Sequence, residues 1–144
     1  MPKGLLIAVV AMLLVSCSER AVDAVVVDAP RAEWLPNESL ELCYNNCDTL
    51  GGYDLLVVAR CGATHNTQAL PLRVEVHSPS GVQFGSEVVL VPTERHKGGS
   101  FVELSTEWIR DARFMEMGDY RFFVTPSQPT DGVWNVGVRL DRAE

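Results

Sequence analysis

Hydrophobic and polar residues alternate along most of the chain beyond residue 39. The clearest stretch begins at residue 70, where four apolar residues (Leu70, Leu72, Val74 and Val76) are separated by Pro71, Arg73 and Glu75. Residues 40–45 alternate in the same way. A period of two predicts strands with one face in the core and the other in water. Residues 53–60 are a more continuous apolar run, typical of a central strand covered on both faces.

Turn sequences divide the alternating segments into short strands. Residues 78–81, Ser-Pro-Ser-Gly, predict a turn into a strand over about residues 82–91, and residues 45–52 are expected to close another hairpin. Gly118 begins a strand over residues 119–125. In the last strand one face is expected to carry Trp134, Val136, Val138 and Leu140.

This pattern predicts an all-β fold, an antiparallel β-sandwich of about eight strands with jelly-roll or immunoglobulin-like connections. One segment is ambiguous, since residues 101–109 fit a strand or a short helix, and residues 105–113 are the only helix candidate. Residues 30–144 are expected to form a single domain, with Trp34 folded onto its core.

The first residues have the order of a secretory signal: Lys3, an apolar run over residues 5–15, and Ser16 before Cys17. The run is too short for a membrane-spanning helix, which needs about 20 residues. Residues 14–17, Leu-Val-Ser-Cys, resemble the lipobox of bacterial lipoproteins, which implies removal of residues 1–16 and acylation of Cys17. Residues 17–29 then form a lipidated amino terminus, followed by either a tether or a first edge strand.

The charge balance restricts the partners. The chain has 12 Lys and Arg against 19 Asp and Glu, a formal net charge of −7, which disfavours nucleic acid. Without a polybasic patch, the acyl chains have to supply the membrane affinity. We therefore expect a protein anchored by lipid in the cell envelope and facing the periplasm. Ser18 and Glu19 favour the outer membrane over the inner one.

Three cysteines remain after the lipid cysteine: Cys43, Cys47 and Cys61. In an oxidising compartment at most one internal bridge can form among them, and the Cys43–Cys47 pair is one candidate. Together with His65 the three cysteines have spacings compatible with zinc. Because zinc competes poorly with disulfide formation outside the cytosol, we expect neither a metal nor a cofactor.

Catalytic patterns are weak. No serine lies in a Gly-x-Ser-x-Gly sequence, and the three histidines (His65, His77 and His96) fall in or beside predicted loops or on a wet face. We therefore expect no enzyme, no catalytic residue and no small-molecule substrate. Six aromatic residues are expected to fill the core rather than to form a carbohydrate-binding platform: Trp34, Trp108, Phe114, Tyr120, Phe122 and Trp134.

The order of short motifs resembles the gliding-motility lipoprotein family GldH. The resemblance includes the lipobox, Trp34, residues 53–55 with the strand that ends at Arg60, and residues 70–76 with Ser80 and Gly81. It is clearest in residues 113–114, 118–122 and 131–140. It implies a lipoprotein needed for bacterial gliding that is associated with envelope machinery also tied to protein secretion, and it implies no catalytic residues. Residues 92–100 are shorter than the corresponding family segment, and the extra cysteines depart from the family pattern.

The sequence therefore predicts a non-enzymatic envelope component that docks protein partners of the motility or secretion apparatus through strand edges and loops. Two alternatives stay open. The first is a carbohydrate- or polymer-binding lipoprotein that uses the aromatic residues. The second is a thiol or metal enzyme built on Cys43, Cys47, Cys61 and His65.

Overall fold

The computed structural model describes residues 23–30, 33–62, 69–93 and 101–143. Within these ranges eight strands form: β1 (Asp23–Asp28), β2 (Leu40–Asn46), β3 (Gly52–Gly62), β4 (Leu70–His77), β5 (Gln83–Pro92), β6 (Phe101–Arg113), β7 (Gly118–Pro126) and β8 (Val133–Arg142). All pairings are antiparallel, so the all-β prediction is confirmed. The described residues include no helix long and apolar enough to span a bilayer. Residues 1–16, Cys17, Ser18, Glu19, His65 and His96 lie outside the described ranges.

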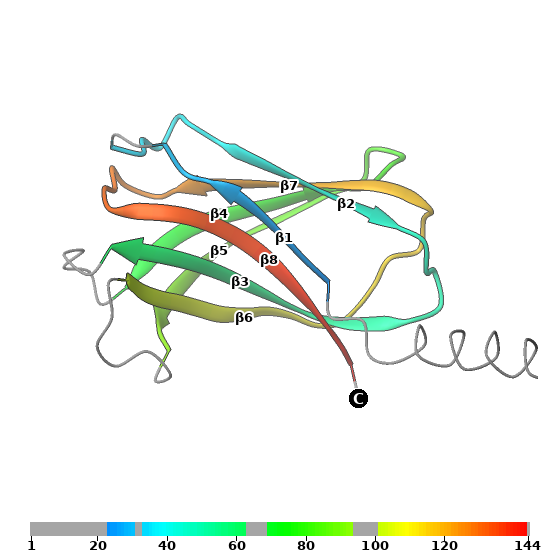
Figure 1. Ribbon diagram of the computed structural model, residues 1–144. Coiled ribbons are helices and arrows are strands. Elements are labelled where there is room, and N and C mark those ends of the chain that lie inside the picture. Colours follow the sequence, from blue (N-terminus) through cyan, green and yellow to red (C-terminus); the bar gives the residue numbers. More distant parts are fainter. Residues whose placement is uncertain (1–22, 31–32, 63–68, 94–100, 144) are drawn as a thin grey trace, which may run out of the picture.

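The strands form one sheet, in the order β1-β8-β3-β6-β5-β4-β7-β2, rolled into two layers (Figure 1). The first layer is β1-β8-β3-β6 and the second is β5-β4-β7-β2. They are joined at β5 and β6 by two residue pairs, Val91–Ser105 and Pro92–Leu104, and β1 lies against β2 at the other side. Successive strands change layer except at the β4–β5 hairpin, which is the jelly-roll type of sandwich.

The core lies between the layers and is built from alternate residues of each strand. Leu70, Leu72 and Val74 of β4 are fully buried, as their spacing predicts, and they face a first layer that contributes residues such as Val57 and Val138. Trp34 lies in the β1–β2 connection and is also buried. Its Nε1 donates to the Glu38 carbonyl at 2.6 Å, and its backbone pairs with Thr130. The connection is thereby fixed onto the core.

One local prediction is wrong, and one open alternative is resolved. Residues 45–52 do not close a hairpin, because β2 and β3 belong to different layers and the segment crosses between them. The ambiguous segment after residue 100 is strand β6 throughout, with no helical turn in residues 105–113. Residues 23–28 form an edge strand that pairs with β8 along its whole length.

Extra residues in two strands change which side chains face inward. Leu55 pairs with Ile109 and Leu56 with Glu107, so Trp108 is an extra residue in β6. In β8 the extra residue is Trp134, since Arg60 pairs with Asn135 and Cys61 with Val133. Such bulges turn a side chain out of its regular alternation.

The bulge at Trp134 corrects one prediction. Val133 is buried, whereas Trp134 is 46% exposed and does not share the inward face of Val136, Val138 and Leu140. Alternation in the sequence predicts the face of a residue only while the strand register is unbroken.

Candidate functional site

The structure separates the three cysteines. Cys43 is exposed on the outward face of β2, and Cys47 is exposed in the segment after β2, with its Sγ 3.3 Å from Asn45 Oδ1. Cys61 is buried in β3, in the other layer. All three are unpaired here, and the Cys43–Cys47 bridge stays a prediction.

The described part of the fold does not bring together the residues that a thiol or metal enzyme would need. Cys61 lies in the core, and burial raises the pKa of its thiol to about 11, which keeps it protonated. Burial also raises the pKa of Cys43, and nearby Asp119 adds to this effect. Among the described residues no three His, Cys, Asp or Glu side chains are grouped to hold a metal, and His65 falls outside them.

The six aromatic residues of the sequence prediction divide into two groups. Four are buried (Trp34, Phe114, Tyr120 and Phe122), which agrees with a core role. Phe114 and Tyr120 pack edge to face with ring centroids 4.7 Å apart. The other two are Trp108, which is half-buried, and Trp134, which is exposed; both are bulged residues. The six therefore do not form one platform.

A polar trough lies on the outward face of the second layer, over β4, β7 and the start of β2. It consists of a depression of ≈ 400 Å³ lined by Ser39, Arg73, Glu75, His77, Phe123 and Thr125, and a second of ≈ 460 Å³ that shares His77 and Phe123 and extends to residues 78–81, Asp119 and Arg121. The His77 ring packs on the Phe123 ring at 4.7 Å.

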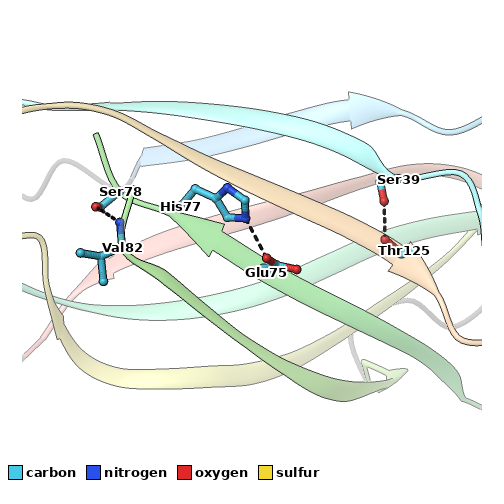
Figure 2. A network of polar contacts seen from close by, with 6 residues as sticks. All are labelled: Ser39, Glu75, His77, Ser78, Val82 and Thr125. Carbon is cyan, nitrogen blue, oxygen red and sulfur yellow. Dashed lines mark hydrogen bonds and ion pairs between the residues drawn. The ribbon is translucent and has the colours of Figure 1, made fainter. Parts of the chain in front are cut away.

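Hydrogen bonds fix the walls of this trough (Figure 2). His77 Nε2 lies 2.8 Å from Glu75 Oε1, and the Ser39 and Thr125 hydroxyls are 2.7 Å apart at the β2 side. The Val82 N–H donates to the Ser78 hydroxyl at the other end. The trough is shallow and carries charges of both signs around one aromatic ring.

The second notable feature is the edge of β5 that faces away from β4. β5 pairs with β4 from Leu90 to Gln83 but pairs with β6 only through Val91 and Pro92. The Ser78 N–H donates to the Val82 carbonyl, and hydrogen-bonded pairs alternate along an antiparallel ladder. The even-numbered residues of β5 therefore bond β4. The backbone groups that point away from β4 belong to Gln83, Gly85, Glu87 and Val89. Within the described ranges, no strand is paired with these four residues on that side.

Exposed apolar side chains accompany the open edge. Phe84 is 53% exposed and Val89 is 52% exposed, and Val91 is similarly open. Glu87 is the one charged residue among the four edge positions. Proteins commonly protect such edges with charges, proline or a covering segment, because an unpaired strand recruits another strand.

Trp108 occupies the space where β5 and β6 separate. Its bulge directs the indole toward β5, where Nε1 donates to Ser86 Oγ at 2.7 Å and the ring lies 6.1 Å from Phe84. The two strands are thus bridged by side chains instead of backbone hydrogen bonds. Phe84 and Trp108 form a partly exposed aromatic surface there.

Sequence reasoning missed both the trough and the open edge. The chain offered one signal for the edge. Residues 88–91, Val-Val-Leu-Val, are apolar at odd and even positions alike, whereas a half-buried strand alternates apolar and polar residues. No local signal marks the trough, because its residues come together only through the pairing of β4 with β7.

Comparisons with known proteins add no family. No protein-family model and no curated protein matches the sequence. Among solved structures, the chain is similar to TmCBM61, determined in complex with beta-1,4-galactotriose, with 17% identity, a TM-score of 0.38, and coverage of 87% of this chain and 89% of that one. It is also similar to the enzymatically active domain of tailspike protein 4 of bacteriophage CBA120, with 7% identity and a TM-score of 0.33, over 85% of this chain and 18% of that one. Both likenesses are too distant to indicate a ligand or an activity.

Thiol labelling tests the placement of the cysteines. In the reduced mature protein at pH 8 we expect a maleimide to label Cys43 and Cys47, while Cys61 reacts only after denaturant is added, since it is buried and its pKa is raised to about 11. Mass spectrometry of the labelled peptides reads this out. Labelling of native Cys61 at the rate of Cys47 would contradict the buried position.

The oxidised protein tests the bridge separately. If Cys43 and Cys47 pair, native protein purified without reductant labels at neither residue until reductant is added.

Proposed function

We propose that this chain is a non-enzymatic, lipid-anchored protein of the bacterial cell envelope that binds an extended segment of a partner protein along strand β5. The observation that carries the proposal is the open edge of β5, where four residues direct unpaired backbone groups away from the sheet. An added strand would satisfy these groups, and its backbone hydrogen bonds would supply affinity.

The side chains along the edge add selectivity to this binding. A strand laid beside β5 would cover Phe84 on one face and Val89 on the other, and both are half exposed without it. Trp108 gives the incoming strand an aromatic contact on the β6 side. We therefore expect a partner segment that has apolar residues on both faces and a positively charged side chain opposite Glu87.

The setting of this interaction follows from the sequence. The lipobox at residues 14–17 supports acylation of Cys17 and a periplasm-facing position, and Ser18 and Glu19 favour the outer membrane over the inner one. The resemblance of residues 113–122 and 131–140 to the GldH family supports a partner in the gliding or secretion apparatus. The acylation, the membrane and the class of partner are therefore all parts of the proposal.

Gly85→Pro tests the edge directly. The substitution removes an N–H that points away from β4 and leaves the β4–β5 hydrogen bonds in place. Gly85→Ala is the matched control, because it keeps the N–H and its Cβ would meet nothing closer than 3.4 Å. We expect a photo-crosslinker at Glu87 to capture a partner in cells producing the wild type or the Gly85→Ala variant, and to lose it in the Gly85→Pro variant. Equal melting temperatures of the two variants exclude loss through unfolding.

The same strains test the biological setting. A strain that lacks the protein should lose gliding or secretion, regain it with Gly85→Ala, and remain defective with Gly85→Pro. A partner crosslink that survives Gly85→Pro would refute the edge, and a deletion strain that glides and secretes normally would refute the motility role.

The polar trough favours a second candidate function, carbohydrate or polymer binding. Its half-buried Phe123 ring is surrounded by the hydrogen-bonding side chains of Arg73, Glu75 and His77, a combination that suits a sugar face and its hydroxyl groups. Calorimetric titration with envelope glycans tests it. Binding should fall at least tenfold in Phe123→Ala, about 1.4 kcal/mol, and be unchanged in Gly85→Pro. If no glycan produces measurable heat, carbohydrate binding is refuted and protein docking is the one candidate function that remains.

A further inference from the structure

One end of the sandwich collects the most exposed apolar side chains in the described part of the chain. Leu50 is 85% exposed, Met115 72%, Val82 67% and Met117 62%. None of the four lies in a strand: they belong to the β2–β3, β4–β5 and β6–β7 connections. We call these four residues the apolar tip.

The strand register places the three connections at the same end. β2 ends where β7 begins, with Asn46 opposite Gly118, and β3 begins where β6 ends, with Gly52 opposite Arg113. The β4–β5 turn joins them there, because the N–H and hydroxyl of Ser80 both donate to the Glu116 carboxylate, at 3.0 and 2.9 Å. All three connections lie at the right in Figure 1.

Internal hydrogen bonds hold the tip in shape. Asp48 Oδ1 accepts the N–H groups of Leu50 and Gly51, at 2.9 and 3.0 Å, and its Oδ2 accepts the Tyr53 hydroxyl at 3.0 Å. The buried Asn46 amide donates to the carbonyls of Phe114 and Glu116 and so links two of the connections. The side chains of Asn46, Asp48, Ser80 and Glu116 are thus hydrogen-bonded within the protein, while the four apolar side chains of the tip are exposed.

The lipid anchor enters at this same end. Asp23, the first residue of β1, pairs with Leu140 near the end of β8, and Tyr53 at the start of β3 pairs with Arg142. Cys17 precedes Asp23 by six positions in the sequence. Six residues reach at most about 20 Å when fully extended. Acyl chains on Cys17 therefore keep this end, rather than the opposite one, close to the bilayer.

We infer that the apolar tip of Leu50, Val82, Met115 and Met117 inserts into the lipid surface and seats the sandwich upright on the membrane that holds its anchor. The inference rests on the acylation of Cys17 in the proposed function and adds a second, non-covalent membrane contact to it. Apolar side chains are stabilised when they leave water for the region between headgroups and acyl chains, and this contribution grows with the apolar area that is buried. The acyl chains supply the affinity, and the tip sets the orientation. The open edge of β5 then runs away from the membrane surface, because Gln83 lies at the tip end and Val91 at the far end.

Fluorescence quenching by brominated lipid tests the seating. The mature lipoprotein is reconstituted into phosphatidylcholine vesicles with or without bromine on the acyl chains, and carries Leu50→Trp at the tip. The matched control is Leu35→Trp, which lies next to Trp34 at the opposite end and is also exposed. After subtraction of the native tryptophan signal, bromine should reduce the emission of the tryptophan at position 50 several-fold and leave that at position 35 unchanged. Equal quenching at the two positions would overturn the inference.

A charged substitution and a lipid label complete the experiment. Met115→Glu with Met117→Glu, added to Leu50→Trp, should abolish most of the quenching, and undiminished quenching would count against insertion of the tip. Incorporation of labelled palmitate is measured in the same preparations. Palmitate incorporated without quenching refutes the seating alone and leaves the proposed function standing, whereas no palmitate at Cys17 refutes both.

Discussion

The packing of two sheet layers against each other is the constraint on which the rest of the structure depends. Each strand has one inward face, and residues such as Leu72 of β4, Phe122 of β7 and Val138 of β8 are fully buried between the layers. Because side chains alternate along a strand, burying this face fixes the outward face as well. The trough, the exposed position of Cys43 and the outward position of Val89 on β5 are all consequences of this strand register.

Closure of the rolled sheet is incomplete, and this leaves the strand edge that we propose as the binding surface. β5 and β6 pair at one end and then separate, and the bulge at Trp108 fills the gap with a side chain that reaches Ser86. A fully paired barrel would have no edge to offer. In the proposed arrangement the acyl anchor and the apolar tip lie at one end of the sandwich, and the open edge leads away from them toward a partner.

Much of the fold could be predicted from the sequence, because short-range alternation carries it. The buried face of β4, the β4–β5 turn and the packing of Trp34 all follow from local patterns. The pairing of distant strands does not, so residues 45–52 resembled a hairpin although they cross between layers. Bulges are equally invisible, which is why Trp134 was expected on the wrong face. The trough and the open edge exist only through long-range pairing; the apolar run of residues 88–91 is the one local sign of the edge, and no local sign marks the trough.

Amide hydrogen exchange along β5, followed by NMR on the purified mature protein, tests the central claim of an open edge most directly. The account predicts an alternating pattern: fast exchange at Gln83, Gly85, Glu87 and Val89, and slow exchange at the intervening residues 84, 86, 88 and 90, whose N–H groups bond β4. Uniformly slow exchange across residues 83–90 would mean that the edge is already paired, and would contradict the account.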